Sequence, residues 1–167
     1  EISLGLVGSE MCIRDRYKVS PWSLSWDDEN YYLIAYDSVE HIIKHFRVDK
    51  MLHIKSIKKF REGKKSFNNF DMAAYARKMF GMYGGKEEYV HIKCDNSLAG
   101  VMIDRFGKDV SMVRLDEEHF VTNVEVSVSR QFLAWVIGLG EGVTILGPQS
   151  VVDMMKEEIK RLTNQYE

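Results

Sequence analysis

Residues 17–37, YKVSPWSLSWDDENYYLIAYD, contain the pattern that decides the fold of the first half of the chain. Two runs rich in Trp, Tyr, Leu and Ile flank four polar residues, Asp27 to Asn30. Such side chains favour half-buried strands, and Asp and Asn tolerate tight turns because they bond to nearby backbone. The segment therefore predicts two strands joined by a tight turn.

Two further runs continue this pattern. Residues 42–48, IIKHFRV, predict a third strand, and residues 51–60, MLHIKSIKKF, predict a fourth. Short strands at this spacing are typical of a small barrel or a curled sheet. Residues 61–70, REGKKSFNNF, break the pattern and predict a linker.

The second half has a different order of elements. Residues 70–80, FDMAAYARKMF, predict a short helix that begins near Asp71 and ends before glycines. Strand and helix patterns then follow in the order βαββαβ, with a final helix at the C-terminus. Val124, Val126 and Val128 alternate with polar neighbours, as in a strand that buries one face. The order predicts a ferredoxin-like split βαβ module.

Composition limits the class of protein. The chain has 167 residues, of which 45% are hydrophobic and 29% charged, and its net charge is -2. These values suit one ordinary globular domain or two very small ones. No run approaches the ~20 apolar residues of a membrane helix, and two cysteines cannot form a disulfide framework. We therefore expect a cytoplasmic protein.

The first sixteen residues, EISLGLVGSEMCIRDR, differ from the rest. They lack the basic start and long apolar core of a signal peptide. Leu6 to Asp15 can be back-translated as CTC GTG GGC TCG GAG ATG TGT ATA AGA GAC, which matches a transposase adapter used in sequencing libraries. We therefore expect residues 1–16 to be adapter-derived and the native sequence to begin near Tyr17. A genuine N-terminal segment is the alternative.

From Tyr17 onward the motifs resemble a WYL domain followed by its C-terminal extension. The Trp-Tyr-Leu motif that names the family stands here as Tyr31-Tyr32-Leu33. VSPWSL before it and FRVDKM after it resemble the family's other signature stretches. In FRVDKM, Arg47 occupies the position of the family's arginine, and Lys50 stands where a second arginine is common. FGMYGG, MIDRFG and ILGPQSVV resemble the extension.

The resemblance implies an α+β fold. Residues 17–66 would form a partial Sm- or SH3-like β-barrel, truncated at its N-terminus. Residues 67–84 would form a linker helix, and residues 85–167 a ferredoxin-like βαββαβ extension with a C-terminal helix. The family's barrel senses a ligand, with single-stranded nucleic acid or a nucleotide as the favoured candidate. Its members bind operator DNA as homodimers through a helix-turn-helix, which this sequence does not contain.

A basic stretch points in the same direction. Between residues 41 and 65 there are nine lysines and arginines and two acids, which give a charge of +7. Basic residues beside exposed aromatics suit single-stranded nucleic acid, because cations hold phosphates and rings stack on bases. The alternative is that the lysines are solvated and protect a sheet edge from aggregation. We favour that alternative for Lys58, Lys59, Lys64 and Lys65.

Arg47 is the strongest candidate ligand-binding residue. It lies within an apolar strand, where an unpaired guanidinium would be costly. Either it pairs with a carboxylate such as Asp49 or Asp37, or it faces a pocket and receives an anion, since its planar group suits bidentate phosphate binding. The resemblance favours the ligand and adds Lys50. His45 is a weaker candidate, which we expect near Arg47 only if a bulge intervenes.

Aromatic residues complete the candidate site. Tyr32 and Tyr36 lie on one face of their strand, with Tyr31 on the other. A tyrosine can line a pocket with its ring and hydroxyl, or belong to an ordinary barrel wall. For Trp22 and Trp26 we expect packing roles.

No arrangement of residues predicts catalysis. The histidines are scattered, and GLGEG at residues 138–142 follows a helix, the reverse of a dinucleotide-binding loop. Cys94 lies among apolar neighbours and predicts an inert buried thiol. We therefore expect no enzyme, no metal and no cofactor. The leading hypothesis is an effector-sensing module of a bacterial transcriptional regulator, and the alternative is a ligand-free dimerisation scaffold.

Overall fold

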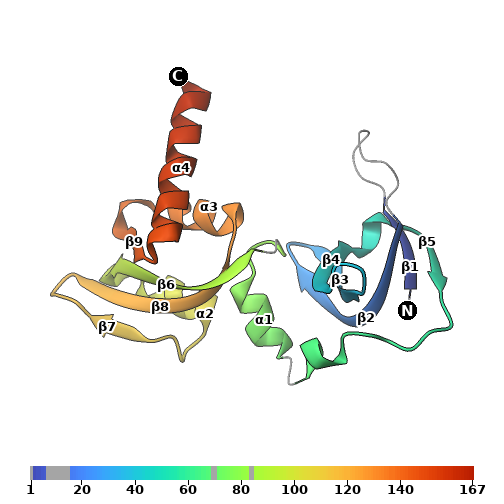
Figure 1. Ribbon diagram of the computed structural model, residues 1–167. Coiled ribbons are helices and arrows are strands. Elements are labelled where there is room, and N and C mark those ends of the chain that lie inside the picture. Colours follow the sequence, from blue (N-terminus) through green and yellow to red (C-terminus); the bar gives the residue numbers. More distant parts are fainter. Residues whose placement is uncertain (1, 7–15, 69–70, 83–84) are drawn as a thin grey trace. The chain divides into compact units, whose positions relative to one another are not determined.

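The computed structural model describes residues 2–6, 16–68, 71–82 and 85–167. It divides into two compact units, Glu1–Ala76 and Arg77–Glu167. The division falls within helix α1 (Met72–Lys78), which lies inside the segment predicted as a linker helix (Figure 1). Asp71 precedes this helix and accepts a hydrogen bond from the amide of Ala74, as its predicted place at the helix start requires.

The first unit is a single antiparallel sheet. Its strands follow the spatial order β4-β3-β2-β1-β5. In chain order the strands are β1 (Ile2–Leu6), β2 (Arg16–Asp27), β3 (Asn30–Asp37), β4 (Ile42–Arg47) and β5 (Met51–Ser56). All four strands predicted from the sequence are therefore confirmed.

A short connection forces this sheet to curl. Strands β4 and β5 form its two edges, yet only the 3-10 helix η1 (Val48–Lys50) joins them. A flat sheet of five strands would separate its edges by about 19 Å, whereas the four steps from Arg47 to Met51 span at most about 14 Å. No pairing joins β4 to β5 in the described part of the chain, so the sheet is a partial, open barrel. The prediction of an α+β fold is confirmed.

The β2–β3 turn has the conformation that its residues predict. Asp28 and Glu29 both have positive φ angles, 44° and 61°. Two such residues between paired strands form the turn whose twist matches that of a hairpin. The side-chain amide of Asn30 donates to the carbonyl of Asp28 and closes the turn at 2.5 Å.

The inner face of the curled sheet holds the first core. Its buried side chains come from three strands, and Tyr17 packs on Phe46 with 5.2 Å between ring centroids. The buried members are Val19, Leu33, Ala35 and Phe46. Strand β1 was not predicted from the sequence. It fills the position between β2 and β5, while residues 7–15, which hold nearly all of the adapter-like codons, lie outside the described residues.

The segment predicted as a linker covers the outer face of β2 and β3. The amide of Glu62 donates to the hydroxyl of Ser20, and the indole of Trp22 donates to the carbonyl of Glu62, each at 2.8 Å. The Trp22 ring stacks on Phe67 at 4.9 Å. Ile34, on the same outer face, is completely buried. Residues 61–67, called the strap below, therefore give the sheet a second apolar layer.

The second unit has the predicted ferredoxin-like topology. Its four strands are antiparallel in the order β7-β8-β6-β9, which is the order expected for a split βαβ unit. The elements run in chain order β6 (Lys86–Asp95), α2 (Ala99–Phe106), β7 (Met112–Arg114), β8 (His119–Val128), α3 (Arg130–Gly138), β9 (Val143–Gly147) and α4 (Gln149–Tyr166).

One face of this second sheet is buried. The alternating Val124, Val126 and Val128 are at most 5% exposed, as their spacing predicts. They belong to a core that includes Phe132 from α3 and Met102 from α2, both completely buried. Both helices therefore pack on the same face of the sheet.

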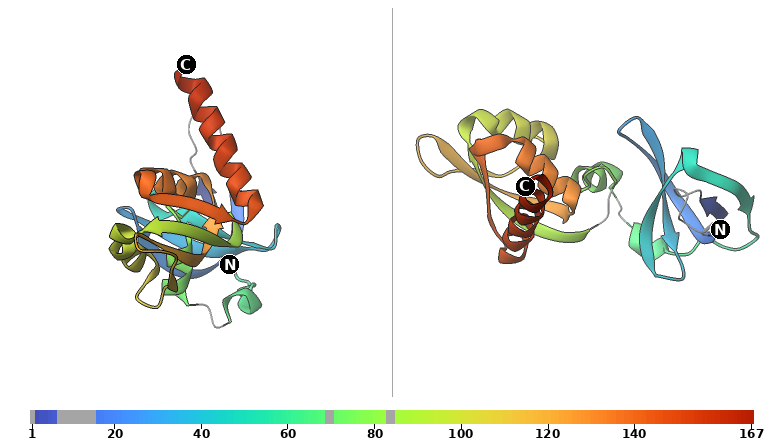
Figure 2. Two further views of the ribbon diagram at one scale, coloured as in Figure 1. Left: turned by 90° about the vertical axis from the view of Figure 1, so that its left-hand side faces the viewer. Right: turned by 90° about the horizontal axis from the view of Figure 1, so that it is seen from above.

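Helix α4 leaves much of its apolar stripe uncovered. Val151 is its one buried residue, whereas Ile159, two turns further on, is 52% exposed. Figures 1 and 2 show its C-terminal half projecting beyond the sheet of its own unit. Among the described residues no helix is both long enough and apolar enough to cross a membrane.

Gly63 of the strap should be difficult to replace. Its φ is +81°, and a Cβ built there would lie 2.4 Å from Cγ of Tyr36. We expect Gly63→Ala to lower the free energy of unfolding by about 2–4 kcal/mol, from left-handed strain and overpacking. Urea unfolding followed by fluorescence in a Trp135→Phe background, where Trp22 and Trp26 report on the first unit, measures this. An unchanged unfolding midpoint in Gly63→Ala would contradict the packing described.

Candidate ligand-binding site

Four of the five predicted site residues share one sheet face. Tyr32 pairs with Arg47 and Ile34 with His45 in an uninterrupted β3–β4 register. Residues two apart on a strand lie on the same face, so Tyr32, Tyr36, His45 and Arg47 all lie on the outer face. The expectation that His45 needs a bulge to approach Arg47 was wrong, because both residues are one step from the inward-facing Phe46.

Arg47 is held by two neighbours at the end of β4. Its Nε and Nη2 donate to the two carboxylate oxygens of Asp49 at 3.0 and 2.9 Å. Nη2 also donates to the side-chain oxygen of Asn30 at 2.7 Å. The sequence left open whether Arg47 pairs with a protein carboxylate or receives an anion. In the structure it pairs with the carboxylate of Asp49, and the Arg47 side chain is still 40% exposed.

Lys50 joins the same carboxylate. Its Nζ lies 3.6 Å from Asp49 Oδ2, and its side chain is 55% exposed. The hydrogen bond from Arg47 lowers the pKa of Asp49, with the charge of Lys50 acting in the same direction. Two cations and one anion therefore meet at η1, on the surface of the first unit.

Asp37, the other carboxylate proposed for Arg47, has a different partner. It lies 2.8 Å from Nζ of Lys44 and accepts hydrogen bonds from the amides of Val39 and Glu40. Burial by itself would raise the pKa of Asp37, but the hydrogen bonds from Lys44 and the two amides outweigh it and lower the pKa. Asp37 therefore stabilises the β3–β4 turn and does not contact the candidate site.

The two tyrosines have different neighbours on the outer face of the sheet. Tyr36 is half-buried, Gly63 lies against its ring, and its hydroxyl is 3.3 Å from Nδ1 of His41. Tyr32 is also half-buried and pairs with Ser25 and Arg47 on the neighbouring strands. The β3–β4 register places Tyr32 directly opposite Arg47, whereas Tyr36 is opposite Ile43 and lies against Gly63 of the strap.

His45 has a partner that sequence reasoning missed. Its Nε2 lies 2.9 Å from the hydroxyl of Tyr75, and the two rings are 5.6 Å apart. Tyr75 lies on α1, thirty residues away, and no local pattern could have indicated the contact. His45 is therefore part of the packing between α1 and the sheet.

The tryptophan expectations were half right. Trp22 packs in the strap, where Arg61 lies 4.4 Å above its ring. Trp26 is 59% exposed, and its ring packs edge-to-face with that of Tyr31, which is 56% exposed, with 4.6 Å between the ring centroids. Lys58, Lys59, Lys64 and Lys65 are exposed, as we expected, but none of them lies on a strand, so the expected place at a sheet edge was wrong.

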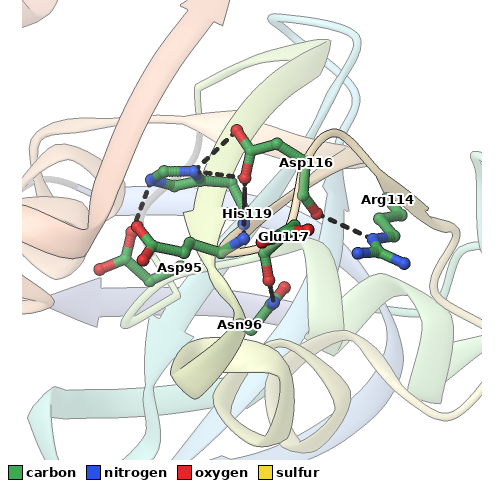
Figure 3. Close-up of polar contacts among 7 residues, drawn as sticks. Asp95, Asn96, Arg114, Asp116, Glu117 and His119 are labelled. Atoms are coloured by element: carbon green, nitrogen blue, oxygen red, sulfur yellow. Dashed lines mark hydrogen bonds and ion pairs between the residues drawn. The ribbon is translucent and has the colours of Figure 1, made fainter.

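A polar cluster in the second unit is structural. Figure 3 shows His119 between Asp116 and Asp95, at 2.8 Å from the first and 3.4 Å from the second. Asp116 also accepts from the amides of Glu118 and His119, which closes the β7–β8 turn. No group of three or more side chains suited to hold a metal occurs in the described part of the chain.

Cys94 is completely buried, as expected. Burial raises the pKa of its thiol to about 11, with a smaller contribution from the charge of Asp95. Such a thiol stays protonated at neutral pH and is a poor nucleophile.

The second unit also has an apolar groove. It has a volume of about 490 Å³ and lies between α4 on one side and α3 and β9 on the other. Its apolar lining comes from Val136, Ile137, Val143, Ile145, Val152, Met155, Ile159 and Leu162. Four of these residues lie on α4 at the spacing of one helix face, so the groove follows the uncovered stripe of that helix.

Comparison with known domains covers both units. Residues 13–56 match the WYL domain, and residues 86–163 match the WCX domain. No curated protein matches the sequence.

Two solved structures resemble the chain over 99% of its length. One is the proteasome accessory factor B/C (PafBC) of Arthrobacter aurescens, at 18% identity and a TM-score of 0.44, of which the chain covers 25%. The other is described as a CRISPR Cas-related protein, at 11% identity and a TM-score of 0.56, of which the chain covers 47%. The chain thus spans at most about half the length of these proteins, and the second likeness supports the fold alone.

Replacing Asp37 should make stability depend less on pH. Because the pKa of Asp37 is lowered in the folded state, its contribution is present above the unfolded value of about 3.9 and is lost as the pH falls through the folded value. We expect Asp37→Asn to cost about 1.5–3 kcal/mol at pH 7, with the difference from wild type shrinking toward pH 2–3. Urea unfolding across this pH range measures it. A constant difference would mean that the Asp37 charge contributes nothing.

Proposed function

Because the chain carries a WYL domain followed by a WCX domain, we propose that it is the effector-sensing part of a bacterial transcriptional regulator. In this proposal it acts by binding and not by catalysis. The first unit binds a nucleic-acid or nucleotide-like ligand, and the second supports a homodimer. Operator DNA is bound by a helix-turn-helix elsewhere in the regulator.

The exposed guanidinium of Arg47 is the observation that carries this proposal. It lies at the end of β4 beside Tyr32, with Lys50 on the adjoining η1. A planar cation next to an aromatic ring suits a nucleotide, since phosphate accepts paired N–H bonds and a base stacks on a ring. Tyr32, Arg47 and Lys50 form the contact surface in this proposal, while Tyr36 and His45 support it from the side that the strap and α1 cover.

The position of the site offers a route from binding to regulation. Arg47 ends β4, and η1 is the chain segment that connects the two edge strands of the open barrel. A ligand that contacts η1 can favour one curl of the sheet over another, provided that it binds the two forms with different affinity.

Replacing Arg47 should weaken oligonucleotide binding. We expect Arg47→Ala to reduce the affinity for fluorescein-labelled dT12 by about tenfold or more at low salt, through loss of charge-assisted bonds. It should also lower the slope of log affinity against log salt by about 0.7, the value for one lost phosphate contact on a single strand. Fluorescence anisotropy at several salt concentrations measures both quantities.

Arg161→Ala is the matched control. Arg161 is similarly exposed and bound to a carboxylate, but it lies on α4 in the second unit. Equal losses of affinity in the two variants would mean that only the net charge of the chain affects binding. Absence of binding by wild type at low salt, for dT12 and for nucleotides, would count against the proposed ligand.

The apolar groove favours dimerisation as a second role. Its outer end is formed by Ile159 and Leu162, and Met154 on the same helix is 40% exposed. An exposed apolar strip on a projecting helix commonly marks a protein interface. A scaffold that dimerises without binding a ligand remains the alternative function.

Replacing Ile159 tests this role. A carboxylate in the groove would be desolvated in any dimer that covers it, so we expect Ile159→Glu to convert a dimer to a monomer. Light scattering coupled to size-exclusion chromatography measures the mass. Lys160→Glu, next to Ile159 but outside the groove, should leave the mass unchanged. A dimer that survives Ile159→Glu would place the interface elsewhere.

A further inference from the structure

We propose that Asp49 is an internal competitor of the ligand: its carboxylate occupies the binding edge of Arg47 and must be displaced before a phosphate can bind there. This inference rests on the proposed function, since it assigns the control of affinity at the same site. It identifies Asp49 as a residue that weakens binding and sets the ligand concentration at which the site responds.

The donors of the guanidinium lead to this inference. A guanidinium has five N–H donors, and its paired binding edges each use two of its nitrogens. Asp49 occupies the edge formed by Nε and Nη2. The second N–H of Nη2 goes to Asn30, which half-occupies the other edge. A phosphate that binds Arg47 through two bonds must therefore displace Asp49 or Asn30.

Charge favours Asp49 as the group that is displaced. Asp49 and an incoming phosphate are both anions, so they cannot share one guanidinium without repulsion. Asn30 is neutral and can remain as a hydrogen-bond acceptor beside the ligand. Lys50 lies 3.6 Å from the same carboxylate, so the departure of Asp49 also frees a second cation.

The local structure allows this exchange. Asp49 lies in η1, a three-residue helix with no buried residue, and its side chain is 49% exposed. An exchange of exposed ion pairs has a modest effect, because solvent screens the charges of such pairs. Asp49 therefore lowers the affinity of the site without closing it.

Replacing Asp49 by its neutral isostere tests the inference. We expect Asp49→Asn to bind dT12 about three- to tenfold more tightly than wild type, from release of the pair and of the repulsion. Glu158→Gln is the matched control, because Glu158 is bound by Arg161 and Arg130 in the second unit. It removes the same charge and should change the affinity much less. The gain should vanish when Arg47→Ala is also present, because Asp49 acts through Arg47.

The possible results separate this inference from the proposed function. Unchanged affinity of Asp49→Asn, with loss of binding in Arg47→Ala, overturns the inference and leaves the function standing. Weaker binding by Asp49→Asn overturns it too, because Asp49 would then orient Arg47 for the ligand. No binding by wild type or by any variant overturns both. Far-ultraviolet circular dichroism of each variant confirms its fold.

Discussion

The pairing of β3 with β4 is the constraint on which the first unit depends. Its uninterrupted register places Leu33 opposite Phe46 on the inner face and Tyr32 opposite Arg47 on the outer face. A shift by one residue would exchange the two faces, burying the guanidinium and exposing the core. The barrel core and the candidate site are therefore fixed by one set of backbone hydrogen bonds, and neither can change register without the other.

Period and turn chemistry were enough to predict most elements. Alternating valines identified β8, the acidic turn identified the β2–β3 hairpin, and the βαββαβ order identified the second unit, because each signal is local. Strand β1 and the strap were not predicted, because their positions depend on contacts with residues far away in the sequence. A strap residue such as Glu62 is held by Ser20, 42 residues earlier, and a contact at that separation leaves no periodic pattern.

Sequence patterns were also unable to predict which residues pair within the candidate site. Sequence spacing placed both Asp37 and Asp49 within reach of Arg47 and could not choose between them. The choice depends on position along the hairpin. Asp37 is opposite Ile42 and pairs with Lys44 at the far end, whereas Asp49 lies two residues after Arg47, in η1. Tyr32 and Tyr36 lie on one face of β3, as predicted, but the contact of Gly63 with Tyr36 is tertiary and leaves no local pattern.

The position of Asp49 links affinity to the shape of the barrel. The three residues of η1 carry the carboxylate that holds Arg47, and they also join the two edges of an open sheet. In a closed barrel, hydrogen bonds between the edge strands would hold them together, and a ligand at the end of one strand would change the curl of the sheet little. In an open sheet the edges are restrained by η1 and by the β1 pairings. In the proposed mechanism, a ligand that displaces Asp49 acts on η1, the segment that connects the edge strands. Binding at an exposed surface would in this way change the curl of the sheet.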